Sequence, residues 1–224
     1  AGSADEGGWN GFNVLHGAAS RVAGLDLGFV PQVRGRDVAG ILDGAAKGDI
    51  EFVYLLGADE LDMTKLGKAF VVYQGSHGDA GAHRADVILP GAAYTEKSGL
   101  YVNAEGRVQM SGRATFPPGE AREDWAILRA LSDVVGKKLP YDTLDALRAA
   151  LIKQAPHFAV RDVVPAQSGD VAIWANVGKA GAVDAMPLIS AVKDFYMTNA
   201  IARASETMAE CSRTFVGSTK MAAE

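Results

Sequence analysis

The chain has 224 residues, of which 48% are apolar, 22% charged and 8% aromatic, a composition typical of a folded globular protein. Its 22 basic and 27 acidic residues give a formal charge of -5, which argues against the basic surface of a nucleic-acid-binding protein. No apolar run approaches the ~18 to 20 residues of a membrane-spanning helix, so we expect no direct membrane insertion. The single cysteine, Cys211, excludes an internal disulfide and, from this chain alone, a four-thiolate metal site.

The N-terminal region is predicted to hold a linker followed by two helices. Residues 1–8 are small, polar and rich in glycine, which predicts a linker, and we expect order to begin near Trp9. Apolar residues at helical spacing predict an amphipathic helix over residues 10–24 and a second helix over residues 35–48. Because the chain starts without Met or a signal-like pattern, we also expect it to continue a longer polypeptide.

Three short apolar runs follow, at residues 52–57, 70–74 and 87–90. Each has the length of a strand, and continuous apolar runs separated by short connections are typical of a parallel sheet covered on both faces. The predicted fold class is therefore α/β. The side chains that we expect to be buried in the sheet are Phe52, Val53, Leu55, Val71, Val72, Val87 and Ile88.

The second half of the chain is predicted to be mostly helical. Residues 100–102 and 107–110, on either side of an Asn- and Gly-containing turn, predict a hairpin. Helices are predicted over residues 120–135, with Trp125, Leu128, Leu131 and Val135 on one face, and from Asp142 or Thr143 onward. Residues 156–181 read as irregular. A last helix is predicted over residues 198–212, with Ile201, Ala204, Met208 and Cys211 on one face, as part of a tail that docks.

Several segments carry a resemblance to a known family. The stretches ADVILP (85–90), YTEKS (94–98) and NAEGRVQ (103–109) resemble the molybdopterin oxidoreductase fold. Four others are similar to the C-terminal part of the large iron–sulfur subunit of respiratory complex I, of the alphaproteobacterial and mitochondrial type. They are YQGSHGD (73–79), PPGEAREDW (117–125), LPYDTL (139–144), and DFYM (194–197) with RAS (203–205).

The resemblance, which runs from about Trp9 to Cys211, implies a fold and a role. It implies an α/β domain over residues 9–135, a parallel sheet flanked by helices, followed by a mostly helical extension over residues 136–224. The role implied is a structural, cofactor-free portion of the peripheral-arm subunit, within NADH to quinone electron transfer coupled to proton translocation. Other peripheral-arm subunits would be its partners, on the bacterial cytoplasmic or mitochondrial matrix side. The 2Fe–2S and 4Fe–4S clusters would lie in an N-terminal region absent from this chain.

The alternative is a fragment of an active molybdopterin-dependent oxidoreductase. In those enzymes a strand end resembling residues 56–60 approaches a guanine dinucleotide, so Gly57, Asp59, Gly75 and Gly78 mark the corresponding, degenerate pocket. We expect Asp59, Glu60 and Asp62 to occupy the first turn after the strand, where their charges repel a pyrophosphate. One carboxylate about 6 Å from a phosphate costs roughly 2 to 3 kcal/mol at an effective dielectric near 20. Lys65, Lys68 and Arg84 lie too far along the chain to compensate.

The glycine-rich loop after the second strand allows two further interpretations. Gly75, Gly78 and Gly81 could form an anion-binding nest, but their spacing favours a tight turn that contains Asp79. His77, Asp79 and His83 could ligate zinc, yet three ligands in a loop without a thiolate are more typical of surface side chains.

Three other groups are weighed in the same way. Tyr94 and Lys97 could be a catalytic pair, but their spacing favours loop residues packed beside the sheet. Cys211 could be reactive, although its place on an apolar stripe favours packing. The acidic trio near Asp59 could act as acid and base, whereas helix capping explains carboxylates at that position. We therefore expect no catalytic residue, no metal ligand and no bound cofactor in this chain.

Overall fold

The computed structural model describes residues 14–166, 181–182, 185–187, 190 and 192–217. The predicted linker over residues 1–8 and the predicted start of order at Trp9 lie outside these residues. The chain divides into two compact units. One is drawn from Ala1–Val30, Gly99–Ser111 and Leu147–Ile189, and the other from Pro31–Ser98, Gly112–Ala146 and Ser190–Glu224. Among the described residues, no helix combines the length and apolar character needed to cross a membrane.

The second unit is built on a parallel sheet, as predicted. Strands β1 (Phe52–Leu56), β2 (Phe70–Gly75) and β3 (Val87–Pro90) form a three-stranded sheet in the order β1-β2-β3. Both pairs are parallel, with Val53 beside Val71 and Val72 beside Val87. The connections carry only short helices, η1 (Met63–Leu66) between β1 and β2 and α3 (Ala80–Arg84) between β2 and β3. All three carboxyl ends therefore meet at one edge of the sheet.

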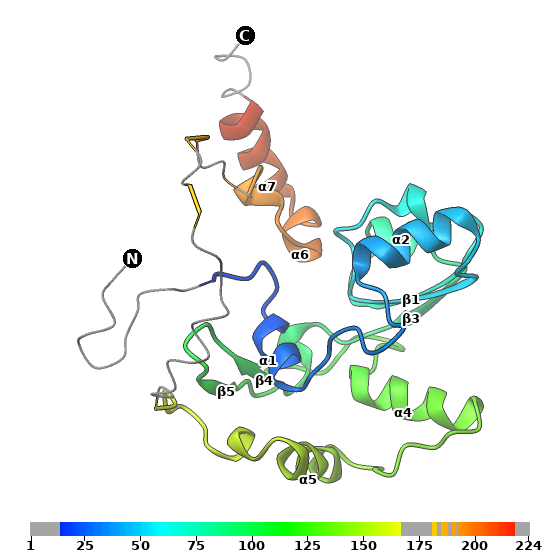
Figure 1. Cartoon of the computed structure of the whole chain (residues 1–224), viewed down its shortest axis with the longest axis vertical. Helices are drawn as coiled ribbons and strands as arrows, with labels where there is room; N and C mark the ends of the chain where they lie inside the picture. Colours follow the sequence, from blue (N-terminus) through cyan, green and yellow to red (C-terminus); the bar gives the residue numbers. More distant parts are fainter. Residues whose placement is uncertain (1–13, 167–180, 183–184, 188–189, 191, 218–224) are drawn as a thin grey trace. The chain divides into compact units, whose positions relative to one another are not determined.

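Helix α2 (Val38–Lys47) packs against one face of this sheet (Figure 1). It begins later than predicted because the Asp37 carboxylate accepts a hydrogen bond from the Gly40 amide, 2.8 Å away, and so caps the helix at Val38. It ends at Gly48, which has a φ of 83°. The buried core between α2 and the sheet contains Ala45, Val53, Leu55, Leu66, Ala69, Val71 and Tyr73.

Phe52 on the face opposite α2, and two residues of β3, are more exposed than predicted. Val53, Leu55, Val71 and Val72 are buried as expected, but Phe52, Val87 and Ile88 are 57%, 40% and 53% exposed, so the prediction of burial was wrong for these three. Side chains alternate along β1, which turns Phe52 away from the α2 face, where its ring stacks on Phe70 at a centroid distance of 6.2 Å. Val87 and Ile88 belong to β3, an edge strand of this sheet.

Helix α4 (Asp124–Val134) begins later than the predicted Glu120. Arg122, just before the helix, instead forms an isolated parallel bridge beside the end of β3, because the Arg122 amide donates to the Pro90 carbonyl at 3.1 Å and the Ala92 amide donates to the Arg122 carbonyl at 2.8 Å. Val135, predicted to share a helix face with Trp125, Leu128 and Leu131, lies just beyond the helix and is 63% exposed. A buried position on this helix is Arg129, 8% exposed.

The carboxylates of Asp133 and Asp142 hold the Arg129 guanidinium, Asp133 at 2.8 Å and Asp142 at 2.5 Å. The next helix, α5 (Leu144–Gln154), starts after Thr143 as predicted, since the Ala146 amide donates to the Thr143 hydroxyl at 3.1 Å.

The other unit contains α1 (Arg21–Asp26), the antiparallel hairpin of β4 (Leu100–Val102) and β5 (Val108–Met110), and η3 (Pro156–Ala159). The hairpin is confirmed. The first predicted helix is wrong in its bounds, because residues 14–20 are not helical and α1 continues through Gly24. Residues 156–166 were predicted to be irregular, yet they supply a core side chain, while residues 167–180 lie outside the described part. The buried cluster comprises Ala23, Val102, Val108, Ala155 and Phe158.

Residues 194–216 form a segment that we call the C-terminal arm. It consists of η5 (Phe195–Met197), α6 (Ala200–Arg203), α7 (Glu206–Cys211) and the π-helical turn η6 (Ser212–Val216). The prediction of one continuous helix was wrong, because the Ser205 hydroxyl accepts from the Met208 amide at 3.3 Å and starts a new helix. Of the four residues predicted to share one helical face, Ile201 and Met208 are each 40% exposed.

Candidate functional site at the carboxyl edge of the sheet

The carboxyl ends of β1, β2 and β3 are the place where parallel α/β sheets usually bind ligands. Three loops converge there, and the chain enters each of them directly from a strand of the sheet. The loop after β1 carries the acidic trio Asp59, Glu60 and Asp62. The loop after β2 carries His77 and Asp79.

Asp59 is turned into the protein instead of toward a ligand. Only 6% of the residue is exposed, and its two carboxylate oxygens accept hydrogen bonds from the Tyr73 hydroxyl at 2.6 Å and from the Gly81 amide at 2.7 Å. The predicted capping role is wrong for Asp59, since no helix begins there. It is confirmed for Asp62, which accepts from the Thr64 amide at 3.1 Å at the start of η1. Asp59 therefore ties the loop after β1 to β2 and α3.

Tyr73 explains two of the three glycines at positions 75, 78 and 81. A Cβ added at Gly75 would lie 2.2 Å from the Tyr73 hydroxyl, and one added at Gly81 would lie 2.7 Å from both the Tyr73 ring and the Asp59 carboxylate. These glycines make room for the Tyr73 ring, whereas a Cβ at Gly78 would have nothing within 4 Å. Burial, followed by the hydrogen bond and the charge of Asp59, raises the pKa of Tyr73 well above its usual value. The phenol thus stays protonated and donates to Asp59.

Glu60 and Asp79 are paired with Arg203 of the C-terminal arm. The Arg203 guanidinium hydrogen-bonds through Nε to Asp79 and through Nη2 to Glu60, the latter at 3.1 Å. The other oxygen of Asp79 accepts from the Ala80 amide at 2.8 Å and caps α3, a short helix that the sequence analysis missed. The hydrogen bond from Arg203 holds the pKa of Asp79 below its usual range.

The amides at the start of α3 are the groups that a phosphate would need. The carboxylates of Asp79 and Asp59 already accept from the Ala80 and Gly81 amides, respectively. A pyrophosphate would have to displace these carboxylates, and the single guanidinium of Arg203, which is shared between Asp79 and Glu60, offsets only part of the charge of the three carboxylates. The residues present at this edge do not fit a dinucleotide.

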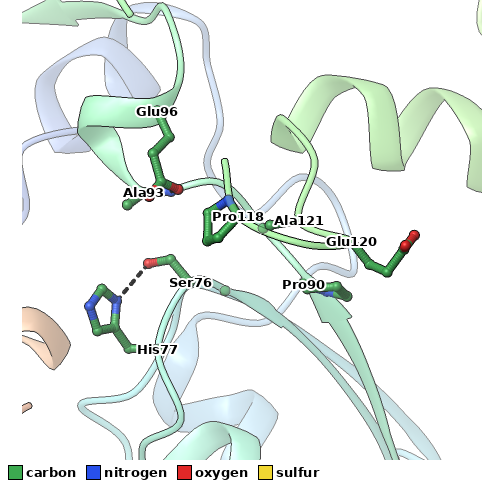
Figure 2. Close-up of a pocket in the computed structure, with 10 residues that line it drawn as sticks. Ser76, His77, Pro90, Ala93, Glu96, Pro118, Glu120 and Ala121 are labelled. Atoms are coloured by element: carbon green, nitrogen blue, oxygen red, sulfur yellow. Dashed lines mark hydrogen bonds between the residues drawn. The ribbon is translucent and has the colours of Figure 1, made fainter. Parts of the chain in front are cut away.

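A cleft of about 370 Å³ lies beside this edge, between the ends of β2 and β3 and the segment that precedes α4. Figure 2 shows the Ser76 hydroxyl directed at the His77 ring, and the oxygen lies 2.9 Å from Nδ1. The Glu96 carboxylate accepts from the Ala93 amide at 2.9 Å. The cleft is lined by Gly75, Ser76, His77, Pro90, Gly91, Ala93, Glu96, Pro118, Glu120 and Ala121. The two carboxylates in this lining, Glu96 and Glu120, disfavour an anionic ligand.

A chain of polar side chains around the buried Gln74 links the sheet to α4 next to the cleft. Gln74, 0% exposed, accepts from the Tyr54 hydroxyl and donates to the Asp124 carboxylate at 2.8 Å, and Lys97 pairs with the same carboxylate. Lys97 therefore packs beside the sheet as expected. Tyr94 is 59% exposed, so the same prediction was wrong for Tyr94. The contacts of Lys97 are explained without a catalytic pair.

The remaining candidates are not brought together into a metal site. Among the described residues, no group of three or more His, Cys, Asp or Glu side chains could hold a metal ion. Asp79 is instead engaged by Arg203. Cys211 was predicted to be packed on the apolar stripe, and it is half-buried at the end of α7.

Comparison with known proteins places this arrangement in a family. The profile of the family described as molybdopterin oxidoreductase matches residues 2–134, more than half of the chain. The chain belongs to the molybdopterin oxidoreductase family. A second profile, which describes the C-terminal region of an NADH-ubiquinone oxidoreductase subunit, matches residues 162–211. The expected family and fold are thereby confirmed.

Two relatives that match most of the chain are subunits of NADH-ubiquinone oxidoreductase, and a third is a mitochondrial NADH dehydrogenase (ubiquinone) iron-sulfur protein. The chain is 49% identical over 217 residues to the mitochondrial 78 kDa subunit of Candida albicans, and the match covers 94% of this chain and 29% of that protein. It is 45% identical to the 75 kDa subunit of Reclinomonas americana, with 91% and 29% covered, and 45% identical to iron-sulfur protein 1 of Solanum tuberosum, with 91% and 26% covered. The chain thus spans less than a third of the length of these relatives.

Proposed function

We propose that this chain is a structural, cofactor-free part of the large iron–sulfur subunit of respiratory complex I. The observation that carries the proposal is the 49% identity to a 78 kDa subunit of NADH-ubiquinone oxidoreductase, extending over 94% of the chain. The match of residues 162–211 to the C-terminal profile of such a subunit supports the same assignment. The whole subunit would take part in NADH to quinone electron transfer coupled to proton translocation.

We also propose that this part has no catalytic role, and the contacts at the carboxyl edge support this proposal. Backbone conformation or packing explains three of the four degenerate pocket positions, which are Gly57, Asp59, Gly75 and Gly78. Gly57 has a φ of 59°, Asp59 binds Tyr73 and Gly81, and Gly75 accommodates the Tyr73 ring. With one cysteine in the chain, the 2Fe–2S and 4Fe–4S clusters would be held by other residues of the longer subunit.

The partners proposed for this part are other subunits of the peripheral arm, on the side of the membrane that faces the bacterial cytoplasm or the mitochondrial matrix. The open face of the sheet supports a role in contacts, because Phe52, Leu56 and Phe70 are 57%, 51% and 47% exposed on it. Apolar clusters of this kind commonly mark surfaces that other protein segments cover.

The alternative function is that of a fragment of an active molybdopterin-dependent oxidoreductase. It is favoured by one observation, the match of residues 2–134 to that family's profile. Metal analysis of the protein purified at its native length separates the two proposals. Iron without molybdenum supports the complex I subunit, and stoichiometric molybdenum supports the alternative.

A second experiment tests the structural role directly. Leu55→Ala, in the core, and Leu56→Ala, on the exposed face, are introduced at native length, and NADH:quinone turnover is measured per assembled complex. We expect Leu55→Ala to lower the amount of complex while turnover per complex stays unchanged. A tenfold lower turnover in an Asp59→Asn or Gly78→Ala variant, with assembly intact, would contradict the proposal.

A further inference from the structure

The contact between Arg203 and the sheet edge joins residues that are far apart in the chain. Arg203 lies at the end of α6, while Glu60 follows β1 and Asp79 follows β2. The side chains of Arg203 and Asp79 are 23% and 24% exposed, so their interaction is partly shielded from solvent, whereas Glu60 is 56% exposed and adds less. Asp79 is therefore the principal partner.

The guanidinium uses three of its nitrogens in three directions. Nε donates to Asp79, Nη2 donates to Glu60, and Nη1 donates to the Met197 carbonyl at 3.3 Å. The first two acceptors belong to the sheet edge and the third to η5 of the C-terminal arm. A lysine ammonium is a compact point charge on a flexible stem and cannot reproduce this planar fork. The arrangement is thus specific for arginine.

The arm that carries Arg203 is held together by contacts of its own. The Asp194 carboxylate accepts from the Tyr196 amide at 3.0 Å and from the Ser212 hydroxyl at 2.5 Å. The Tyr196 ring stacks on Phe215 at a centroid distance of 5.9 Å. Because η5 and η6 are joined in this way, anchoring Arg203 anchors the arm as one unit.

We propose that Glu60 and Asp79 form a guanidinium-binding site that latches the C-terminal arm, through Arg203, onto the carboxyl edge of the sheet. The carboxyl edge then binds an arginine side chain of the same chain, and it does not serve as a site for a soluble anion. The latch is independent of the proposed role in complex I, because it concerns only contacts within this chain.

The latch is tested by hydrogen–deuterium exchange of the protein at its native length. Arg203→Ala and Arg203→Lys should both raise exchange across residues 195–211 by about tenfold, since a charge-assisted hydrogen bond is lost. Arg213→Lys, an exposed position on η6, is the matched control and should change nothing. Exchange across β1 and β2 should stay unchanged, which shows that the sheet is intact.

Asp79→Asn offers a milder test, because Asn is also a good N-cap and can still accept from the Ala80 amide. It should raise exchange in the arm without affecting α3. The double variant Asp79→Asn with Arg203→Ala should exchange no faster than Arg203→Ala alone. Three results would each overturn the latch. They are exchange in the arm of Arg203→Ala that equals that of the parent protein, exchange in Arg203→Lys that is as slow as in the parent, and exchange in the double variant that is faster than in Arg203→Ala.

Discussion

The Tyr73 hydroxyl lies 2.6 Å from the carboxylate of Asp59, and both side chains are almost fully buried, at 2% and 6% exposure. The pair connects the middle strand of the sheet to the loop after β1. A buried carboxylate needs hydrogen-bond donors, and Asp59 has two, from Tyr73 and from the Gly81 amide. The carboxyl edge is thus closed by the chain's own polar groups.

Tyr73→Phe should destabilise the protein by about 1.5 to 3 kcal/mol, because it removes a hydrogen bond to a buried charged group while preserving the ring. The change in the free energy of unfolding is measured by urea denaturation. Tyr94→Phe is the matched control, since Tyr94 is 59% exposed and the loss there should be small. Equal effects of the two substitutions would contradict the role of the pair.

Leu55→Ala should lower the free energy of unfolding by roughly 2 to 5 kcal/mol, through lost apolar burial and the cavity that remains. Leu55 is 3% exposed within the core beneath α2, whereas its neighbour Leu56 is 51% exposed on the other face. Leu56→Ala should therefore cost much less. A larger loss for Leu56→Ala would mean that the open face is the more tightly packed one.

The strands of the sheet could be predicted because each is a continuous apolar run, a signal contained within a few residues. The partners of the site could not, because Asp59 is separated from Tyr73 by 14 positions and from Gly81 by 22, and Asp79 from Arg203 by 124. No local pattern links such residues. The break in the C-terminal helix was within reach, since a serine at position 205 is a common N-cap.

Gly75→Ala and Gly78→Ala should differ sharply, although the two glycines are close in the chain, Gly75 at the end of β2 and Gly78 in the loop that follows. A Cβ at Gly75 would overlap the Tyr73 hydroxyl, and relieving that overlap should cost about 1 to 3 kcal/mol. A Cβ at Gly78 has nothing within 4 Å, so thermal unfolding of that variant should match the parent. Similar melting temperatures for the two variants would show that Tyr73 does not constrain the loop.

The docking of the C-terminal arm should depend on pH in the acid range. The hydrogen bond from Arg203 lowers the pKa of Asp79, and the charge of nearby His83 acts in the same direction. Because the pKa of Asp79 is lowered in the folded protein, the stabilisation from its ion pair is complete above the ordinary Asp pKa of about 3.9. This stabilisation is lost as the pH falls through the lowered pKa of the folded state. Exchange in residues 195–211, corrected for its intrinsic pH dependence, should be constant from about pH 8 to 5 and rise below about 4. Asp79→Asn should remove this rise.

The carboxyl edge of the sheet should not bind guanine nucleotides. The Ala80 and Gly81 amides already donate to Asp79 and Asp59, and Glu60 adds a third carboxylate, so the one guanidinium of Arg203 offsets only part of this charge. One carboxylate about 6 Å from a phosphate costs roughly 2 to 3 kcal/mol at an effective dielectric near 20, more than a typical hydrogen bond returns. Hydrogen exchange across residues 57–84, measured at native length with millimolar GDP, should match exchange without it. Protection of this segment that disappears in a Gly57→Ala variant would reveal a nucleotide site and favour the molybdopterin-dependent alternative.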